Sequence, residues 1–249
     1  MSILENRNRI GSFTSSEIFN LLTEGRTKGT PGKPCIDYIA EKNMERRLGR
    51  ALTTESNARA LTWGKLIEER VFELLPLEYT YCSQDTITHP AIPFWAGSPD
   101  GYKSDEGKTV VDIKCPLTLK SFCQLVDPIY NGQTGMDAVN EIRFRHKSGE
   151  QYYWQLVSNA ILSGAKWAEL IVYVPYLSEL KSIREMVKSF EGDRNPIAWI
   201  NFSNDNELPY IIEDIVYSNI NIIRFEILQE DKDRLTNAVL NAGKLLKEI

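Results

Sequence analysis

Two residues that could carry out chemistry share one side of a short predicted strand. Residues 109–114 read Thr-Val-Val-Asp-Ile-Lys, and this β-branched run before Pro116 predicts a strand. Side chains alternate along a strand, so Asp112 and Lys114 should point to the same side. A solvated salt bridge on a half-exposed strand would explain them without any chemistry, and an Asp-x-Lys triplet alone favours that explanation.

A second aspartate changes the interpretation. Asp100 lies in the turn-forming sequence Ser98-Pro-Asp-Gly101, and residues 104–107 predict a hairpin turn that would bring it beside Asp112. Two converging carboxylates leave uncompensated negative charge, which a hard cation such as Mg²⁺ relieves with oxygen ligands. A lysine alongside can orient or deprotonate a water and stabilise negative charge on a phosphate. Together these groups supply what hydrolysis of a phosphodiester requires.

Helices and strands around this hairpin must position it. Apolar periodicity and stop residues predict helices over residues 15–22, 35–48, 54–75, 151–162 and 178–190, and a C-terminal helix with Leu235, Val239, Ala242 and Leu246 inward. Strands are predicted near residues 79–88, 94–96, 168–175 and 221–228. Loops are predicted at residues 23–34 and 127–150, the second with a basic patch of Arg143, Arg145, His146 and Lys147. The sequence therefore predicts one α/β domain, residues 1–249, with a mixed central sheet flanked by helices.

The first predicted helix begins with a capping box. Thr14 stands at the N-cap position and Glu17 follows three residues later. The N-terminus of such a helix offers unpaired N–H groups and a positive dipole end, which favour a bound phosphate. Capping alone would also account for Thr14.

Composition and charge limit the function classes. The chain has 249 residues, of which 42% are hydrophobic, and a net charge of −5. A protein that grips nucleic acid over its whole surface is normally basic, so a nucleic-acid site here must be a local basic lining. No apolar run is long enough to span a bilayer, and the N-terminus lacks the apolar core of a secretory signal, which predicts a cytosolic protein. The four cysteines lack metal-site spacing and are predicted to be reduced thiols.

The hairpin residues resemble the PD-(D/E)xK nuclease motif, as Pro99-Asp100 followed by Asp112-Ile113-Lys114. Further motifs, in the same order along the chain, resemble the bacteriophage lambda exonuclease family, the YqaJ-type viral recombinases. These motifs are Arg9-Ile-Gly11, Thr14-Ser-Ser-Glu17, Asn57-Ala-Arg-Ala-Leu-Thr-Trp-Gly-Lys65 with Glu68, and Tyr153-Trp-Gln155. The resemblance spans residues 9 to about 175, and residues 176–249 carry no recognised motif.

The resemblance implies a restriction-endonuclease-like fold and a 5′→3′ exonuclease that digests one strand of duplex DNA from its end. It implies Mg²⁺ as cofactor, with Mn²⁺ as a substitute, and a ring-shaped homotrimer. It also implies action together with a single-strand annealing protein in phage recombination. The protein would then be a viral protein in the cytoplasm of a bacterial host, or one encoded by a prophage. No contact with membranes is expected.

Roles for individual residues follow from the same resemblance. Asp100, Asp112, the carbonyl of Ile113 and Glu68 are implied as metal ligands, with Lys114 as the catalytic lysine. Gln155 is implied to position Lys114 or the attacking water. Arg9, Thr14 and Ser16 are implied to hold the 5′-phosphate, and Lys120 is a candidate phosphate contact or an ordinary surface lysine. Two positions depart from the pattern: Asp112 stands where close relatives often have Glu, and Asn159 follows Gln155 where the wider helicase–nuclease group has Tyr.

Other functions remain open at this stage. A restriction- or repair-type endonuclease of the same fold would use the same residues and would cut a circular substrate internally. A catalytically inactive DNA-end-binding protein would have no need for three costly polar groups near apolar strand faces. A purely structural salt bridge between Asp112 and Lys114 predicts that Mg²⁺ has no effect on stability.

Overall fold

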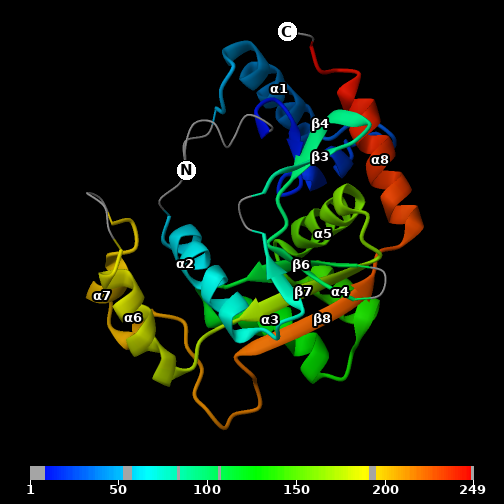
Figure 1. The fold of residues 1–249 in the computed structure, drawn as a ribbon. Helices are drawn as coiled ribbons and strands as arrows, with labels where there is room; N and C mark the ends of the chain where they lie inside the picture. The colour runs from blue at the N-terminus through cyan, green and yellow to red at the C-terminus, as the bar shows by residue number, and fades with distance from the viewer. Residues whose placement is uncertain (1–8, 53–57, 83–84, 106–107, 191–194, 248–249) are drawn as a thin grey trace.

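The hairpin that carries Asp100, Asp112 and Lys114 belongs to a mixed five-stranded sheet. The computed structural model describes residues 9–52, 58–82, 85–105, 108–190 and 195–247. The strand order is β2-β5-β6-β7-β8, in which β6 and β7 run parallel and the other neighbours antiparallel. Figure 1 labels β6, β7 and β8 of this sheet. These strands are β2 (Tyr79–Tyr81), β5 (Gly101–Lys103), β6 (Thr109–Lys114), β7 (Trp167–Tyr173) and β8 (Ile220–Glu226).

The register of the hairpin places the two aspartates side by side. Gly101 of β5 lies opposite Val111 of β6, so Asp100 is level with Asp112. A side chain at position 101 would collide with the ring of Phe72 and the carbonyl of Thr80, so only glycine fits after Asp100. The predicted hairpin is confirmed, although residues 106–107 of its turn lie outside the described residues.

Helices cover both faces of this sheet, which confirms the predicted fold class. One face carries α3 (Leu119–Tyr130), α4 (Gly135–Arg145) and α5 (Gly149–Ser163), which share a core with Val110. The other face carries α2 (Arg59–Leu74) and α6 (Leu180–Lys188), which pack against Val111 and Ile113. Because Asp112 and Lys114 alternate with Val111 and Ile113, they point to the face covered by α5.

A smaller sheet holds the N-terminal segment. It consists of β1 (Phe13–Thr14), β4 (Ile92–Gly97) and β3 (Ile87–His89), with β1 parallel and β3 antiparallel to β4. In Figure 1 this sheet lies with α1 (Lys33–Leu48) and α8 (Gln229–Gly243) at the top of the molecule, near the C-terminus. The side-chain amide of Asn43 on α1 donates to the carbonyl of Leu245, which ties α1 to the segment after α8.

Short elements complete the chain. They are the 3₁₀ helices η2 (Ile18–Leu22), η3 (Leu177–Glu179) and η4 (Asp205–Glu207) and the four-residue helix α7 (Trp199–Phe202). Most predicted elements agree with the structure within a few residues, and the predicted helix over residues 54–75 begins at Arg59, with residues 53–57 outside the described part. Within the described ranges, no helix is long and apolar enough to cross a membrane.

The predicted capping-box helix at residues 15–22 is wrong. Thr14 belongs to β1, and η2 is a single 3₁₀ helix that starts after Glu17, whose side chain makes no capping hydrogen bond. The Thr14 N–H instead donates to the hydroxyl of Tyr38 at 2.8 Å, and Thr14 pairs with Ala96 of β4. Strand pairing and this tertiary hydrogen bond replace the local capping that the sequence suggested.

The predicted loop at residues 127–150 is also wrong. The segment contains the end of α3, all of α4 and the start of α5. Ala138, Val139 and Ile142 of α4 are buried in the same core as Val110. Burial of these apolar side chains against the sheet stabilises helices in a segment that contains Pro128 and three glycines.

Candidate active site

Asp112 is a fully buried carboxylate whose oxygens have almost no hydrogen-bond partners. Its side chain is 0% exposed, and the Lys114 ammonium lies 2.7 Å from Oδ2. Apart from this ion pair, neither carboxylate oxygen has a hydrogen-bond partner within the described part of the chain. Buried carboxylates are costly unless they are paired or bind a metal, so the free lone pairs of Asp112 require an explanation.

Asp100 approaches the same point from β5. Its Oδ2 accepts a hydrogen bond of 2.6 Å from the backbone N–H of Ile113. That N–H is available because β5 pairs with β6 only as far as Val111. The N–H and C=O of a strand residue point to the same side, so the Ile113 carbonyl also faces the Asp100 side of β6.

A cleft of about 480 Å³ opens at the C-terminal end of β6. Glu68 of α2 lines it together with Ile113 and Lys114. Its other polar lining residues are Lys65, Thr118, Ser121, His146, Lys147 and Tyr152. The cleft thus places a third carboxylate and several donors at the end of the strand that carries the buried Asp112.

Burial and mutual repulsion raise the pKa of all three acids. Burial, followed by the charge of Asp112, raises the pKa of Glu68 to about 7. Burial and the same charge raise the pKa of Asp100 well above its ordinary value. Burial also raises the pKa of Asp112, against the opposing effect of the Lys114 ammonium. Ionisation of all three acids together is therefore unfavourable in the metal-free site, even with the Lys114 ammonium beside Asp112.

Lys114 is held as a cation. Burial alone would lower its pKa, but the charges of Asp112 and Asp100 outweigh burial and raise the pKa above its ordinary value. The ammonium also donates to Oε1 of Gln155 at 3.3 Å. A lysine that keeps its proton can orient a water or stabilise charge on a phosphate, but it cannot take a proton from water.

A match to a known domain identifies the family. Residues 6–166 match the YqaJ-like viral recombinase domain. This chain belongs to that family. The match confirms the predicted resemblance, and it includes Asp100, Asp112, Lys114 and Gln155.

Solved structures show the same fold as this YqaJ-like chain. The alkaline exonuclease LHK-Exo from Laribacter hongkongensis is 18% identical, with 98% of this chain and 92% of that chain covered and a TM-score of 0.59. LHK-Exo in complex with dAMP gives 16% identity over the same shares of both chains, with a TM-score of 0.59. A phage-related exonuclease from Haemophilus somnus 129PT is 13% identical, with 94% and 93% covered and a TM-score of 0.60. The chain thus has the restriction-endonuclease-like fold, and no curated protein matches it significantly.

The predicted phosphate-binding residues of this YqaJ-like domain lie in different surroundings. Arg9 and Ser16 are half-buried, whereas Thr14 is 6% exposed and its hydroxyl contacts that of Tyr38. Lys120 is exposed on the first turn of α3 and does not line the cleft. The structure therefore removes the capped helix as the basis for a phosphate site. The assignment of Arg9, Thr14 and Ser16 to the 5′-phosphate stays a prediction.

The segment that carries Arg9 is fixed to α1 through Gly11. Glu45 accepts a 2.9 Å hydrogen bond from the Gly11 N–H, and Arg46 donates a 2.8 Å hydrogen bond to the Gly11 carbonyl. Gly11 has a φ of +66°, and a Cβ there would overlap the Arg46 side chain. On the other side, Gln151 of α5 donates to the carbonyl of Ser16 at 2.9 Å. The helix that provides Gln155 therefore also holds the Ser16 turn.

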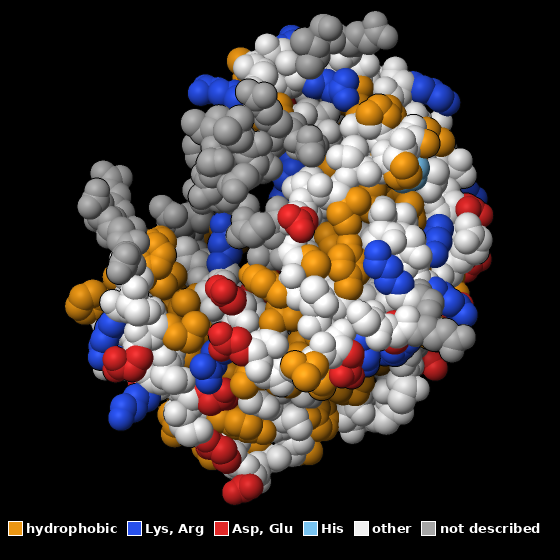
Figure 2. Space-filling view, viewed as in Figure 1, with side chains coloured by type: hydrophobic (Ala, Val, Ile, Leu, Met, Phe, Trp, Pro, Cys, Tyr) orange, Lys and Arg blue, Asp and Glu red, His pale blue; other side chains and the backbone are white. Residues whose placement is uncertain are grey.

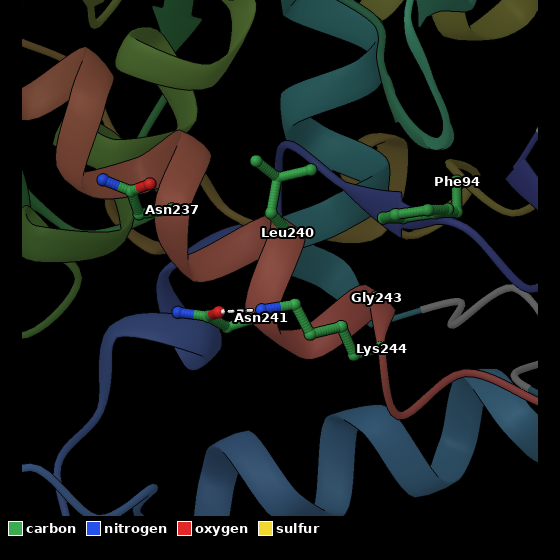
Figure 3. Close-up of a pocket in the computed structure, with 6 residues that line it drawn as sticks. All are labelled: Phe94, Asn237, Leu240, Asn241, Gly243 and Lys244. Carbon is green, nitrogen blue, oxygen red and sulfur yellow. Dashed lines mark hydrogen bonds between the residues drawn. The ribbon is translucent and has the colours of Figure 1, made fainter.

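A second hollow, of about 470 Å³, lies between α8 and β4. Figure 3 shows its lining: Phe94, Asn237, Leu240, Asn241, Gly243 and Lys244. The Lys244 ammonium donates to the side chain of Asn241, and no carboxylate is among these lining residues. This hollow offers no acid–base pair, so the cleft at β6 is the candidate active site of the YqaJ-like domain.

Sequence reasoning missed several residues of the cleft. Tyr152 and Ser121 were not singled out, and His146 and Lys147 were named only as a basic patch, without a role in the site. Asn159, one turn after Gln155 on α5, is 0% exposed, and neither polar atom of its side chain has a partner among the described residues. These positions depend on how α3, α5 and the turn before α5 pack together, which no local spacing encodes.

The raised pKa of Glu68 predicts how stability changes with pH in metal-free protein. Between its unfolded value of 4.5 and its folded value of about 7, the folded state binds more protons, so the free energy of unfolding falls as pH rises. The loss from Glu68 is on the order of 2 kcal/mol across this window. Urea unfolding in EDTA from pH 4.5 to 8 should show a shallower fall for Glu68→Gln than for wild type. If the free energy of unfolding changed equally with pH in Glu68→Gln and in wild type, the raised pKa of Glu68 would be contradicted. Glu73→Gln, at an exposed position on the same helix, is the control.

Proposed function

We propose that this protein is a Mg²⁺-dependent exonuclease that digests one strand of linear duplex DNA in the 5′→3′ direction from its end. The observation that carries the proposal is the buried Asp112 carboxylate, which among the described residues is paired only with Lys114. It lies level with Asp100, on the strand whose last residues, Ile113 and Lys114, line the cleft. Membership in the YqaJ-like viral recombinase family supports a role in phage-type recombination.

The donor set suits a hard cation. Mg²⁺ prefers carboxylate and carbonyl oxygens and keeps several waters, so Asp100, Asp112 and the Ile113 carbonyl form a fitting set, with Glu68 beside a bound water. Within the described ranges, no three His, Cys, Asp or Glu side chains enclose an ion by themselves, which agrees with a site completed by a backbone carbonyl and waters. When bound there, Mg²⁺ supplies a more acidic water and stabilises charge on the phosphate. Mn²⁺ should substitute, because it takes the same oxygen ligands.

The other residues of the cleft act on the phosphate and on Lys114. The Lys114 ammonium stabilises the negative charge that develops on the phosphate oxygens, and Gln155 holds that ammonium from α5. Figure 2 shows Lys and Arg side chains interspersed with Asp and Glu on the face drawn there, which agrees with a local site rather than a wholly basic surface. The structural relative LHK-Exo binds dAMP, which supports a deoxynucleoside monophosphate as the product of the cleft here.

The topology of the DNA tests the exonuclease proposal against its alternative. The protein should release mononucleotides from linear duplex and leave a covalently closed circle of the same sequence intact. Internal cuts in the circle would instead favour a restriction- or repair-type endonuclease of the same fold. Binding to DNA ends without release of nucleotides would favour an inactive end-binding protein.

Arg9 is expected to select 5′-phosphorylated ends, since an arginine fork holds two phosphate oxygens at once. Arg9→Ala should slow digestion of a 5′-phosphorylated duplex about tenfold and change digestion of the 5′-hydroxyl duplex much less. The measurement compares the two rates on substrates that differ only in that phosphate, with the exposed Arg26→Ala as control. An undiminished preference in Arg9→Ala would show that Arg9 is an ordinary surface arginine.

Assembly and partners are part of the same proposal. Family membership supports a homotrimeric ring around DNA and action beside a single-strand annealing protein in the bacterial cytoplasm. Sedimentation equilibrium tests the first point, because a trimer has three times the 28.5 kDa mass of one chain.

A further inference from the structure

Tyr152 contacts the ammonium of Lys114, and the proposed function gives this contact no role. The Lys114 ammonium lies 4.6 Å from the centre of the Tyr152 ring, a distance typical of a cation–π interaction. Tyr152 and Gln155 are three residues apart on α5, so they share one face of that helix. The ammonium is therefore held by Asp112 from its own strand and by two side chains from α5.

His146 in turn supports the Tyr152 ring. The two rings are stacked, with centroids 5.4 Å apart and planes inclined by 28°. Nδ1 of His146 accepts a hydrogen bond from the Ser148 N–H, so the proton is on Nε2, which donates to Ser121 at 2.8 Å. Burial lowers the pKa of His146, in keeping with this neutral form. A neutral imidazole does not compete with Lys114 for the electron-rich faces of the ring.

These contacts form a continuous chain from α3 to the catalytic lysine. Ser121 fixes His146, His146 fixes the Tyr152 ring, and the ring contacts the ammonium. A lysine has a flexible four-carbon stem, so its charge is well placed only where its surroundings restrict it. Catalytic groups must be held within a fraction of an ångström of their productive position.

We propose that Tyr152 is a positioning residue for Lys114 and that His146 positions Tyr152. The inference rests on the proposed nuclease function and goes beyond it, since it assigns part of the turnover rate to an aromatic ring that is not among the proposed metal ligands. The ring, rather than the hydroxyl, carries the effect, because a phenyl face attracts an ammonium as a phenol face does.

Kinetics of three variants test this assignment. Tyr152→Leu should lower kcat about tenfold with KM for duplex DNA unchanged, Tyr152→Phe should stay within about twofold of wild type, and His146→Ala should fall between them. The control is Tyr102→Leu, because Lys108 lies 4.4 Å from the Tyr102 ring near the N-terminal end of β6, whereas Lys114 is at the C-terminal end of that strand. Wild-type kcat in Tyr152→Leu, or an equal loss in Tyr152→Phe, would overturn the proposal.

A second readout does not depend on activity. In protein labelled with [¹³C]lysine, the ring current of Tyr152 should shift the ε-methylene signal of Lys114, which Lys114→Ala identifies. The shift should persist in Tyr152→Phe and vanish in Tyr152→Leu. If wild type showed these chemical shifts but did not digest DNA, the proposed function would be refuted. The contact of the Lys114 ammonium with the Tyr152 ring would still stand. An ε-methylene signal that is the same in wild type and Tyr152→Leu would refute the placement itself.

Discussion

Asp112→Asn is expected to slow release of nucleotides from linear duplex DNA by about 10²-fold or more, with DNA binding close to wild type. Asparagine has nearly the same shape, so the change removes a buried negative charge without leaving a cavity. The carboxylate is fully buried and has oxygens without hydrogen-bond partners in the described structure, which is where a metal ligand is expected. Digestion rates and a filter-binding titration on the same duplex measure the two effects separately.

The matched control for this variant is Asp137→Asn, since Asp137 is exposed on the first turn of α4. It should digest DNA at the wild-type rate. Turnover in Asp112→Asn within a few-fold of wild type would mean that Asp112 has a structural role only.

Lys114→Met is expected to destabilise the metal-free protein by about 3 kcal/mol and to abolish digestion. Removing the lysine leaves Asp112 buried without its counter-charge, and breaking a buried pair is far more costly than losing an exposed one. Mg²⁺ binds only the folded state, so it should restore more stability to Lys114→Met than it adds to wild type. Urea unfolding in EDTA and in millimolar Mg²⁺ gives the four free energies of unfolding that are needed.

The exposed Lys120→Met serves as the control and should behave as wild type. A purely structural salt bridge predicts the same loss in EDTA but no recovery with Mg²⁺. Absence of recovery in a folded sample would therefore favour that alternative over a metal site.

The hairpin that carries Asp100, Asp112 and Lys114 could be predicted because its signals are local. Alternation places Asp112 and Lys114 on one side of β6, and the turn after Asp100 returns the chain onto the same strand. Pro116 marks the end of the strand, and the predicted bounds of β6 agree with the structure. Each of these features depends on a few consecutive residues.

The N-terminal segment and the helical segment before Gln155 could not be predicted in the same way. Thr14 fits a capping box locally, but Tyr38 and β4 lie far away in sequence and decide its structure. The α4 segment has weak local signals, and burial against the sheet makes it helical. For the same reason, local sequence signals do not predict the contact of His146 with Tyr152, which depends on how the turn between α4 and α5 packs.

Residues 176–249 carry no recognised motif, yet they complete the sheet that holds the site. Strand β8 pairs with β7 along its whole length, and β7 is the parallel neighbour of β6. Ile223 and Phe225 of β8 are buried in the core shared with α5. This segment therefore supports the site through packing, and none of its described residues lines the cleft.

The most direct test of the central claim uses one linear, 5′-phosphorylated duplex labelled either at the 5′ end or at the 3′ end of the same strand. With Mg²⁺, the 5′ label should leave first, as a mononucleotide, while the 3′ label stays in shortening strands. In EDTA, neither label should be released. Early release of the 3′ label, internal fragments, or digestion in EDTA would contradict a metal-dependent 5′→3′ exonuclease built on Asp100, Asp112 and Lys114.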